Sequence, residues 1–362
     1  MSAPILIMAG GTGGHVFPAL AVAAALRERN EQVVWLGTER GLEAQLVPAA
    51  GIPLEFIRVS GLRGKGVMNW IAAPFRVAVA LIDALGVLRR RRPKVVLGMG
   101  GFASGPGGFA AWLLRRPLVI HEQNSVAGLT NRLLAGMARE VLEAFPGAFS
   151  GRKTTCVGNP VRQSVVDLPE PSARFAGRYG PLRLLVLGGS QGALALNEPV
   201  PQALALIDAD QRPEVVHQAG WSTVDVARAA YRSAGVAARV ESFIDDMARM
   251  YGWADLVICR SGALTVSELA AAGLGAILIP FPAAVDDHQT TNGEFLAREG
   301  AAIIMQQRDL TAQALALEIR RCIDDRSLVL ERARRARKLA SPDATRIVAD
   351  RCQAWASEGG KS

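Results

Sequence analysis

The stretch that decides the fold is Met8-Ala9-Gly10-Gly11-Thr12-Gly13-Gly14-His15-Val16-Phe17-Pro18. The apolar residues 5–8 before it predict a buried strand, and Pro18 with the alanine-rich run after it predicts a helix. Glycines at such a turn let backbone amides approach a ligand, and the helix N-terminus favours phosphate or sugar oxygens. The helix dipole disfavours a charged His15 in the first turn, so we expect a neutral imidazole available as a base.

Strand-like and helix-like segments alternate along the whole chain. Apolar runs that predict strands lie at 33–37, 95–98, 118–121, 183–187, 215–217, 239–241, 256–259 and 276–280. This alternation is typical of parallel sheets covered by helices on both faces. A looser, proline-containing stretch at 159–181 indicates a domain boundary, and a second glycine turn at 188–193 then repeats the opening pattern. We therefore expect two similar doubly wound α/β domains with a ligand cleft between them.

Composition limits the classes of protein to consider. The length of 362 residues fits two domains, and the net charge of +8 favours an acidic partner such as a phosphorylated substrate, anionic lipid or nucleic acid. The four cysteines lack CxxC spacing, which indicates free thiols in a reducing compartment. The four histidines lack metal-ligand spacing, so we expect no metal site. The arginines of 332–338 are expected on a solvated helix face.

The segment 68–94 departs from ordinary helix patterning. Its first 21 residues, 68–88, carry only the charges of Arg76 and Asp83, and four consecutive arginines follow at 89–92. A helix that is apolar on nearly all sides is either a buried core helix or an interfacial helix whose cations meet anionic headgroups. We find no signal peptide, and no run reaches the roughly 18 apolar residues of a spanning helix. We expect a cytoplasmic protein that can attach to a membrane surface.

Polar or glycine-rich groups follow several predicted strands, at the sheet edge where open α/β folds bind ligands. These groups lie at 98–108, 121–124, 259–268 and 286–289. Glycine amides and helix N-termini suit a diphosphate, and Glu268 can accept two hydrogen bonds from a ribose diol. Together they favour a nucleotide-sugar. No nucleophile with an adjacent base and no GxxxxGK[ST] motif is present, which argues against a covalent intermediate or a P-loop ATPase.

Two other classes of protein fit the sequence less well. An NAD-dependent oxidoreductase would need an acidic residue at the end of the second strand, where Glu39 is poorly placed. A nucleic-acid-binding module would interleave cations with aromatic residues, whereas only 6% of the residues are aromatic and the cations gather beside apolar residues. We therefore expect no nucleic-acid partner.

Seven motifs, in this order, resemble the MurG family of bacterial UDP-N-acetylglucosamine (UDP-GlcNAc) transferases. They are GGTGGH at 10–15, SGLRGKG at 60–66, GGFASGPGG at 100–108, HEQN at 121–124, GNPVR at 158–162, GGSQGA at 188–193 and RSGALTVSE at 260–268. The resemblance implies a GT-B fold of two Rossmann-like domains. It implies an acceptor and membrane-facing domain at 1–162, a UDP-GlcNAc-binding domain at 163–340, and a C-terminal helix at 341–362 that crosses back to the first domain.

The resemblance also implies a reaction. The family moves N-acetylglucosamine, with inversion, from UDP-GlcNAc to the C4 hydroxyl of undecaprenyl-diphosphate-MurNAc-pentapeptide (lipid I), which gives lipid II for peptidoglycan. Motif matching places the contacts with UDP-GlcNAc at Thr12, Gly13, Gly14, Asn124, Arg162, Ser190, Ile244, Ala263, Leu264, Thr265, Val266, Ser267, Glu268 and Gln289. In this assignment the Ser190 turn and the following helix hold the diphosphate, Ile244 the uracil, Glu268 the ribose and Gln289 the sugar.

An inverting transfer needs a base for the acceptor hydroxyl and stabilisation of the UDP leaving group, without a protein nucleophile. His15 is the candidate base and Glu122 is its rival, since both lie on the ligand-binding edge of the first domain. Arg162 and the Ser190 turn would stabilise the diphosphate charge. Because cations and helix termini suffice for this task, we expect no metal and no cofactor.

The resemblance finally implies a location and partners. We expect peripheral attachment to the cytoplasmic face of the inner membrane, through anionic lipids at 68–94. Cell-wall synthesis proteins are expected as further partners, with roles in cell wall biogenesis, cell shape, cell division and the cell cycle. A different GT-B enzyme with another lipid acceptor is the nearest alternative.

Overall fold

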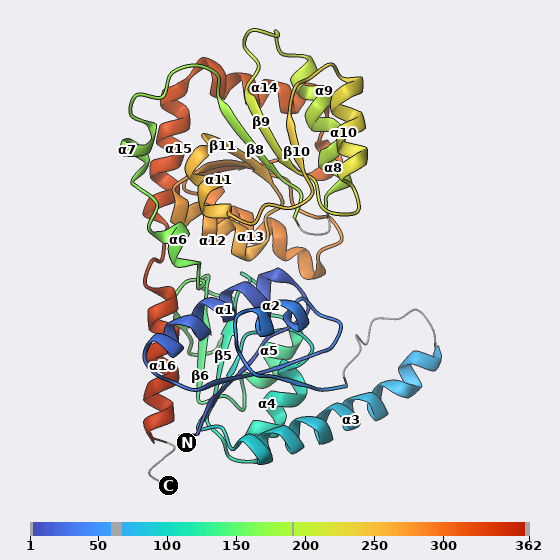
Figure 1. The fold of residues 1–362 in the computed structure, drawn as a ribbon, viewed down its shortest axis with the longest axis vertical. Coiled ribbons are helices and arrows are strands. Elements are labelled where there is room, and N and C mark those ends of the chain that lie inside the picture. The colour runs from blue at the N-terminus through green and yellow to red at the C-terminus, as the bar shows by residue number, and fades with distance from the viewer. Residues whose placement is uncertain (1–2, 59–66, 190–191, 359–362) are drawn as a thin grey trace. The chain divides into compact units, whose positions relative to one another are not determined.

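The structure is a computed structural model, and it describes residues 3–58, 67–189 and 192–358. The chain divides into two compact units (Figure 1). Unit 1 comprises Met1–Arg162 with Pro342–Ser362, and unit 2 comprises Gln163–Ser341. The C-terminal residues therefore belong to the same unit as the opening glycine turn.

Unit 1 contains a parallel sheet in the order β3-β2-β1-β4-β5-β6-β7. The strands are β1 (Ile5–Met8), β2 (Val33–Gly37), β3 (Leu54–Phe56), β4 (Val95–Gly98), β5 (Leu118–Glu122), β6 (Glu140–Glu143) and β7 (Thr155–Cys156). In the central strand β1, Ile5 and Ile7 pack on one face, while Leu6 and Met8 pack on the other. Burial on both faces explains why this strand is a continuous apolar run.

Helices cover both faces of the unit 1 sheet. They are α1 (Gly13–Glu28), α2 (Glu43–Ala49), α3 (Val67–Arg91), α4 (Ser104–Leu113), α5 (Leu129–Leu134) and α16 (Ala344–Glu358). Helices α1 and α16 share one core with the sheet, in which Val348 and Cys352 of α16 are fully buried. An ion pair of 2.6 Å between Arg29 and Asp350 also ties α16 to the end of α1. Helices α3, α4 and α5 contribute to the core on the opposite face.

Unit 2 repeats this architecture with a parallel sheet in the order β10-β9-β8-β11-β12-β13. The strands are β8 (Arg183–Leu187), β9 (Glu214–Gln218), β10 (Arg239–Glu241), β11 (Leu256–Cys259), β12 (Gly275–Leu278) and β13 (Ala302–Ile304). The helices are α6 (Gln163–Val166), α7 (Pro171–Phe175), α8 (Leu194–Asn197), α9 (Pro199–Ala205), α10 (Val224–Ser233), α11 (Met247–Trp253), α12 (Ala263–Ala272), α13 (His288–Ala297), α14 (Ala312–Asp324) and α15 (Arg326–Lys338), with short 3-10 turns at Val285–Asp287 and Gln307–Asp309. The prediction of two doubly wound, parallel-sheet α/β domains is confirmed.

The arginine-rich helix α15 differs from the sequence-based expectation of a solvated face. Arg332 is only 8% exposed, and its guanidinium donates a hydrogen bond to Sγ of Cys322. Arg337 donates hydrogen bonds to the carbonyl oxygens of Ala271 and Leu168. Arginine stems pack along apolar surface while their guanidinium groups reach backbone oxygens, so part of this charge is structural.

Helix α3 is not the buried core helix that its apolar sequence allowed. Its C-terminal half packs on the sheet through Ala84, Val87 and Leu88. Its middle exposes apolar side chains, with Phe75 at 75% and Ile82 at 65% exposure. Figure 1 shows the N-terminal part of α3 extending away from the sheet of unit 1. In the part of the chain that the structure describes, no helix has the length and apolarity needed to cross a membrane.

Candidate functional site

The opening glycine turn is held by a buried carboxylate beneath it. Glu43 of α2 is fully buried, and its Oε2 accepts a hydrogen bond of 2.9 Å from the backbone N–H of Gly11. Its Oε1 accepts from the backbone N–H and the hydroxyl of Thr38, at 3.0 and 2.7 Å. A Cβ at Gly10, Gly37 or Gly41 would collide with the Glu43 side chain. These glycines therefore leave room for the carboxylate under the turn.

His15 lies in the first turn of α1 and is partly exposed. Its Nδ1 lies 2.9 Å from Oε1 of Gln123, which follows β5 and is only 1% exposed. Its ring also packs against Gly100, where a Cβ would lie 2.6 Å from Nδ1. The glycines after β4 thus allow the imidazole to lie close to the backbone, with one ring nitrogen bonded to Gln123.

The rival base, Glu122, is placed differently. It is 2% exposed, and its Oε1 accepts hydrogen bonds from the backbone N–H and the side-chain amide of Asn124, at 3.0 and 3.1 Å. Its Oε2 accepts from the N–H of Gly128 at 3.1 Å and from Nδ2 of Asn131 at 2.8 Å. Four donors occupy a buried carboxylate, so this side chain is arranged to order the loop that leads to α5.

The other predicted residues of unit 1 gather around the start of α1. Thr12 is the residue that precedes α1, while Gly13 and Gly14 form its first turn. Arg162 places its guanidinium 5.4 Å from the ring centroid of Phe17, also on α1. The structure therefore brings Thr12, Gly13, Gly14 and Arg162 to the same end of the same helix as His15.

The second glycine turn is held by an amide side chain instead of a carboxylate. Gln218 of β9 accepts from the N–H of Gly189 at 3.1 Å and donates from Nε2 to the carbonyl oxygen of Gly189 at 2.9 Å. Ser190, the predicted diphosphate contact, lies outside the described residues. The helix predicted after this turn is only the four-residue α8, which is too short to have a significant helix dipole.

Helix α12 presents the predicted run from Ala263 to Glu268. It follows β11 directly, and Gly262 at its N-cap has no side-chain cap that would occupy the terminal amides. Ala263, Val266 and Glu268 are buried, whereas Leu264, Thr265 and Ser267 are partly exposed. Glu268 is 5% exposed and its Oε2 accepts a hydrogen bond of 3.0 Å from the hydroxyl of Tyr251.

Two further predicted contacts lie on loops and helix starts of unit 2. Ile244 is partly exposed in the connection between β10 and α11. Gln289 is the second residue of α13, and its Oε1 accepts a hydrogen bond of 2.9 Å from the N–H of Phe281. Arg260, the residue after β11, donates to the carbonyl oxygens of Ile279 and Pro280. These residues follow β10, β11 and β12 at the carboxyl edge of the sheet, as the sequence predicted.

Sequence reasoning gave no role to three side chains that organise these turns: Glu43, Gln123 and Gln218. Glu43 and Gln218 lie in ordinary amphipathic contexts that carry no local signal. Gln123 lies inside the HEQN motif, where its neighbours received the roles. The signal for Glu43 in the sequence is indirect: Gly37 and Gly41 precede it closely, but Gly10 comes near it only in the folded chain.

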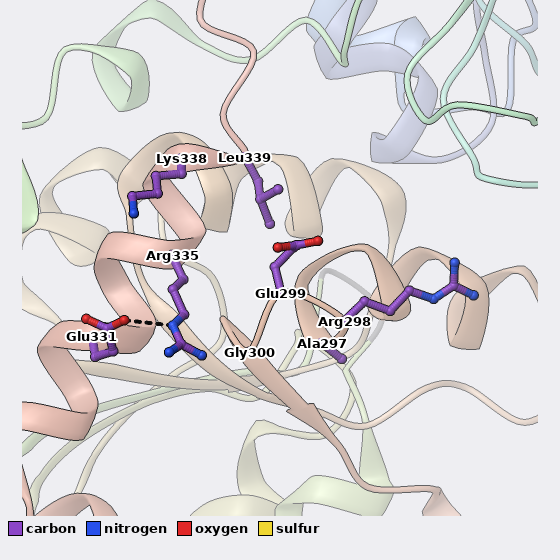
Figure 2. A pocket seen from close by; sticks show the side chains of 8 residues that line it. All are labelled: Ala297, Arg298, Glu299, Gly300, Glu331, Arg335, Lys338 and Leu339. Atoms are coloured by element: carbon purple, nitrogen blue, oxygen red, sulfur yellow. Dashed lines mark hydrogen bonds and ion pairs between the residues drawn. The ribbon is translucent and has the colours of Figure 1, made fainter.

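One pocket in unit 2 lies apart from these residues. It has a volume of about 600 Å³ and is lined by Ala297, Arg298, Glu299, Gly300, Glu331, Arg335, Lys338 and Leu339 (Figure 2). Arg335 and Glu331 form an ion pair of 2.8 Å at its wall. None of the predicted substrate contacts lines it. In the described part of the chain, no group of three or more His, Cys, Asp or Glu residues is placed to hold a metal ion.

Comparisons with known proteins define the class. Residues 5–143 match the glycosyltransferase family 28 N-terminal domain, and residues 183–347 match the family's C-terminal domain. The chain belongs to glycosyltransferase family 28.

The relatives within this family point to one kind of enzyme. The chain is 58% identical over 352 residues to a protein of Alkalilimnicola ehrlichii, covering 97% of this chain and 99% of the relative. It is 56% identical over 358 residues to one of Nitrosococcus oceani, covering 99% and 100%. Both relatives bear the name UDP-N-acetylglucosamine--N-acetylmuramyl-(pentapeptide) pyrophosphoryl-undecaprenol N-acetylglucosamine transferase.

Solved structures agree with this result. The crystal structure of MurG from Acinetobacter baumannii superposes with a TM-score of 0.84 at 42% identity, covering 98% of this chain and 100% of that one. The calicheamicin glycosyltransferase CalG4, at 20% identity and a TM-score of 0.69, shares the fold. The predicted resemblance to the MurG family and the GT-B class of fold are confirmed.

Proposed function

We propose that this protein is a hexosyltransferase that moves N-acetylglucosamine from UDP-GlcNAc to the C4 hydroxyl of lipid I. The product is lipid II, the disaccharide precursor of peptidoglycan. The observation that carries the proposal is the identity of 56–58% over nearly the whole chain with relatives that bear this enzyme's name. Roles in cell wall biogenesis, cell shape and cell division follow from this product.

The two units take different substrates in this proposal. Unit 2 binds UDP-GlcNAc: the turn at 188–193 and the N-terminus of α12 take the diphosphate, Ile244 takes the uracil, Glu268 takes the ribose, and Gln289 takes the sugar. The uncapped amides at the start of α12 and the neutral Gln218 under the Gly189 turn support this assignment. Unit 1 binds the acceptor, supplies the base and contributes Arg162 to the stabilisation of UDP.

His15 is the base in this mechanism. The acceptor hydroxyl passes its proton to the imidazole as the oxygen attacks C1 of N-acetylglucosamine, and UDP leaves with the electron pair of the broken C1–O bond. A single displacement inverts the configuration at C1, and it needs no protein nucleophile. The partial exposure of His15 supports this role, whereas the carboxylate of Glu122 is buried and bonded to four donors. Asn124 then acts through the loop that it forms with Glu122.

Arg162 and the amides at the glycine turn of 188–193 stabilise the developing charge on UDP. Fixed donors and a cation can neutralise a diphosphate without a divalent ion. We therefore expect chelation to leave activity intact, and activity that a chelator abolishes and magnesium restores would contradict this expectation.

The surface of α3 adapts the protein to a lipid acceptor. Phe75, Val77 and Ile82 are exposed, and the arginines of the last turn, such as Arg90, lie along the same helix. Exposed apolar side chains beside cations are typical of helices that lie at an anionic membrane surface. We propose that the protein attaches peripherally to the cytoplasmic face of the inner membrane through residues 68–94. At this membrane surface it would contact cell-wall synthesis proteins. Arg63, Lys65 and the side chains of Trp70 and Ile71 lie outside what the structure describes.

The direct test is transfer of labelled N-acetylglucosamine from UDP to a lipid I analogue. Formation of the labelled disaccharide-lipid supports the proposal, and transfer to a different lipid acceptor only would replace it with another GT-B activity. For the membrane step, flotation with anionic vesicles should be strong at low salt and weaken as salt rises. Salt-insensitive flotation, or none at all, would contradict the electrostatic contribution.

A further inference from the structure

A chain of hydrogen bonds, the His15 relay, runs from the partly exposed imidazole of His15 into the core of unit 1. Nδ1 of His15 lies 2.9 Å from Oε1 of Gln123. Nε2 of Gln123 lies 3.2 Å from Nδ1 of His121, and Nε2 of His121 lies 2.9 Å from the carbonyl oxygen of Gly158. His121 is fully buried and Gln123 is 1% exposed, so only the outer end of this chain reaches solvent.

Two backbone carbonyls fix the direction of every hydrogen bond in the chain. A carbonyl oxygen only accepts, so Nε2 of His121 must carry the proton that it shares with Gly158. Burial lowers the pKa of His121 to about 4, so its ring is neutral near pH 7 and its Nδ1 is an acceptor. Nδ1 therefore accepts from the amide of Gln123.

The orientation of the Gln123 amide is determined in the same way. Its Nε2 also lies 3.3 Å from the backbone carbonyl oxygen of His121, so a flipped amide would set two acceptor oxygens against each other. Oε1 must then face His15, where it only accepts. The nitrogen of His15 at this contact, Nδ1, must carry a proton.

We propose that Gln123 and His121 are positioning residues that hold neutral His15 in its Nδ1–H tautomer, which leaves Nε2 as the unprotonated nitrogen. The other tautomer would present an N–H at Nε2 and could not take a proton there. The relay also holds the ring against Gly100, where a Cβ would collide with it. This inference rests on the proposed function, in which His15 is the base.

The decisive measurement is a long-range proton–nitrogen NMR spectrum of the protein with nitrogen-15-labelled histidine. The chain has four histidines, and His15→Ala identifies the signals of His15 by their loss. At a pH where His15 is neutral, we expect a protonated Nδ1 and an unprotonated Nε2. In Gln123→Met, which keeps the side-chain length but removes the amide, we expect the proton to redistribute toward Nε2. A protonated Nε2 in the wild type would overturn the proposal.

Two more variants distinguish the hydrogen bonding of His121 from its contribution to packing. His121→Leu removes the acceptor for Gln123, whereas His121→Asn offers an amide oxygen where Nδ1 was. We expect His121→Leu to lose the Nδ1–H preference at His15 and His121→Asn to retain most of it. Gln45→Met, on the exposed side of α2, is the matched control and should leave the spectrum of His15 unchanged. An unchanged tautomer in both Gln123→Met and His121→Leu would overturn the proposal.

The kinetic consequence gives a second readout. Gln123→Met should lower kcat about 10- to 100-fold, less than loss of the base itself, with little change in KM for UDP-GlcNAc. Unchanged kcat in a variant whose tautomer has shifted would refute the role of the relay in catalysis. If the wild type transfers no N-acetylglucosamine to lipid I, the proposed function fails, whereas the tautomer measurement still tests the relay.

Discussion

The two glycine turns of this protein begin from the same sequence pattern and are built differently. In unit 1 the Gly11 N–H donates to the carboxylate of Glu43, whereas in unit 2 the Gly189 N–H donates to the neutral amide of Gln218. A buried negative charge beneath a turn opposes a bound phosphate, but a neutral amide does not. The first turn is therefore poorly suited to a diphosphate, although the sequence pattern alone favours one.

The residues after each turn extend this difference. The first turn continues into the 16-residue helix α1, which carries His15 in its first turn. The second turn continues into the four-residue α8. The N–H donors that it offers to an anion therefore come mainly from the turn itself and not from the end of a long helix. The polar group beneath each glycine turn therefore decides its ligand chemistry: in our proposal the first turn presents a base and the second holds an anion.

The largest expected effect tests whether the first turn carries the chemistry. His15→Ala should lower kcat about 10²- to 10⁴-fold, because a positioned base contributes that much to proton transfer. KM for UDP-GlcNAc should change little, since His15 has no assigned contact with the donor. Steady-state transfer to a lipid I analogue measures both values.

Glu122→Gln is the companion variant for this test. It keeps one acceptor oxygen for the donors around Glu122, so we expect a smaller loss of kcat than in His15→Ala. Near wild-type kcat in His15→Ala, combined with a loss of several orders of magnitude in the Glu122 variant, would reverse the assignment of the base.

Much of the fold followed from the sequence, because buried parallel strands are continuous apolar runs that glycine turns interrupt. The strands at 5–8, 183–187 and 256–259 were predicted at their observed bounds. The sequence after the second strand predicts a helix over 39–47, but the observed helix begins at Glu43, whose side chain turns inward to Gly11 and Thr38. The arginine-rich sequence of 311–338 predicts a helical segment, which the structure divides at Asp325; its carboxylate caps α15 by accepting from the N–H of Ser327.

The candidate site was less predictable than the fold, and for a physical reason. Motifs show which residues gather at the carboxyl edge of a sheet, but they do not show which polar groups already have partners. The sequence favours His15 as the base over its rival Glu122 by position alone, and the four donors around Glu122 add a structural reason for that preference. Glu43 and Gln218 act from distant elements, so no local pattern revealed them.

The second prediction tests the carboxylate beneath the first turn. Glu43→Ala leaves the N–H groups of Thr38 and Gly11 without their acceptor and opens a cavity, so we expect unit 1 to lose about 2–4 kcal/mol of unfolding free energy. Glu43→Gln keeps one acceptor oxygen and should lose less. Urea unfolding measures the difference, and equal losses in the two variants would show that shape, not the acceptor, supports the turn.

The third prediction concerns a feature that the two units share, a buried histidine in the sheet. Burial lowers the pKa of His121 in β5 and of His217 in β9 to about 4, below the usual value of 6.5. The unfolded chain therefore binds more protons between pH 6.5 and 4. This contribution to stability is complete above pH 6.5 and is lost as the pH falls toward 4, on the order of 3 kcal/mol for each histidine.

Urea unfolding at pH 7 and pH 5 tests this shared feature. The free energy of unfolding should fall with acid, and His217→Leu should make the fall smaller, because one of the two histidines no longer titrates. The difference between the two pH values is the relevant quantity, since loss of the 3.1 Å contact with the hydroxyl of Tyr231 lowers stability at both. A variant with the full wild-type pH dependence would contradict the role of His217.

The smallest expected effect concerns the second glycine turn. Gln218→Leu removes both hydrogen bonds to Gly189, while the long apolar side chain keeps most of the packing. Loss of one or two neutral hydrogen bonds should raise the dissociation constant of UDP roughly 3- to 10-fold, with little change in kcat. Gln202→Leu, at an exposed position on α9, is the matched control and should leave UDP affinity unchanged. If Gln218→Leu instead lowered kcat at constant UDP affinity, the second turn would share in the chemistry, and the contrast between a catalytic turn and a donor-binding turn would fail.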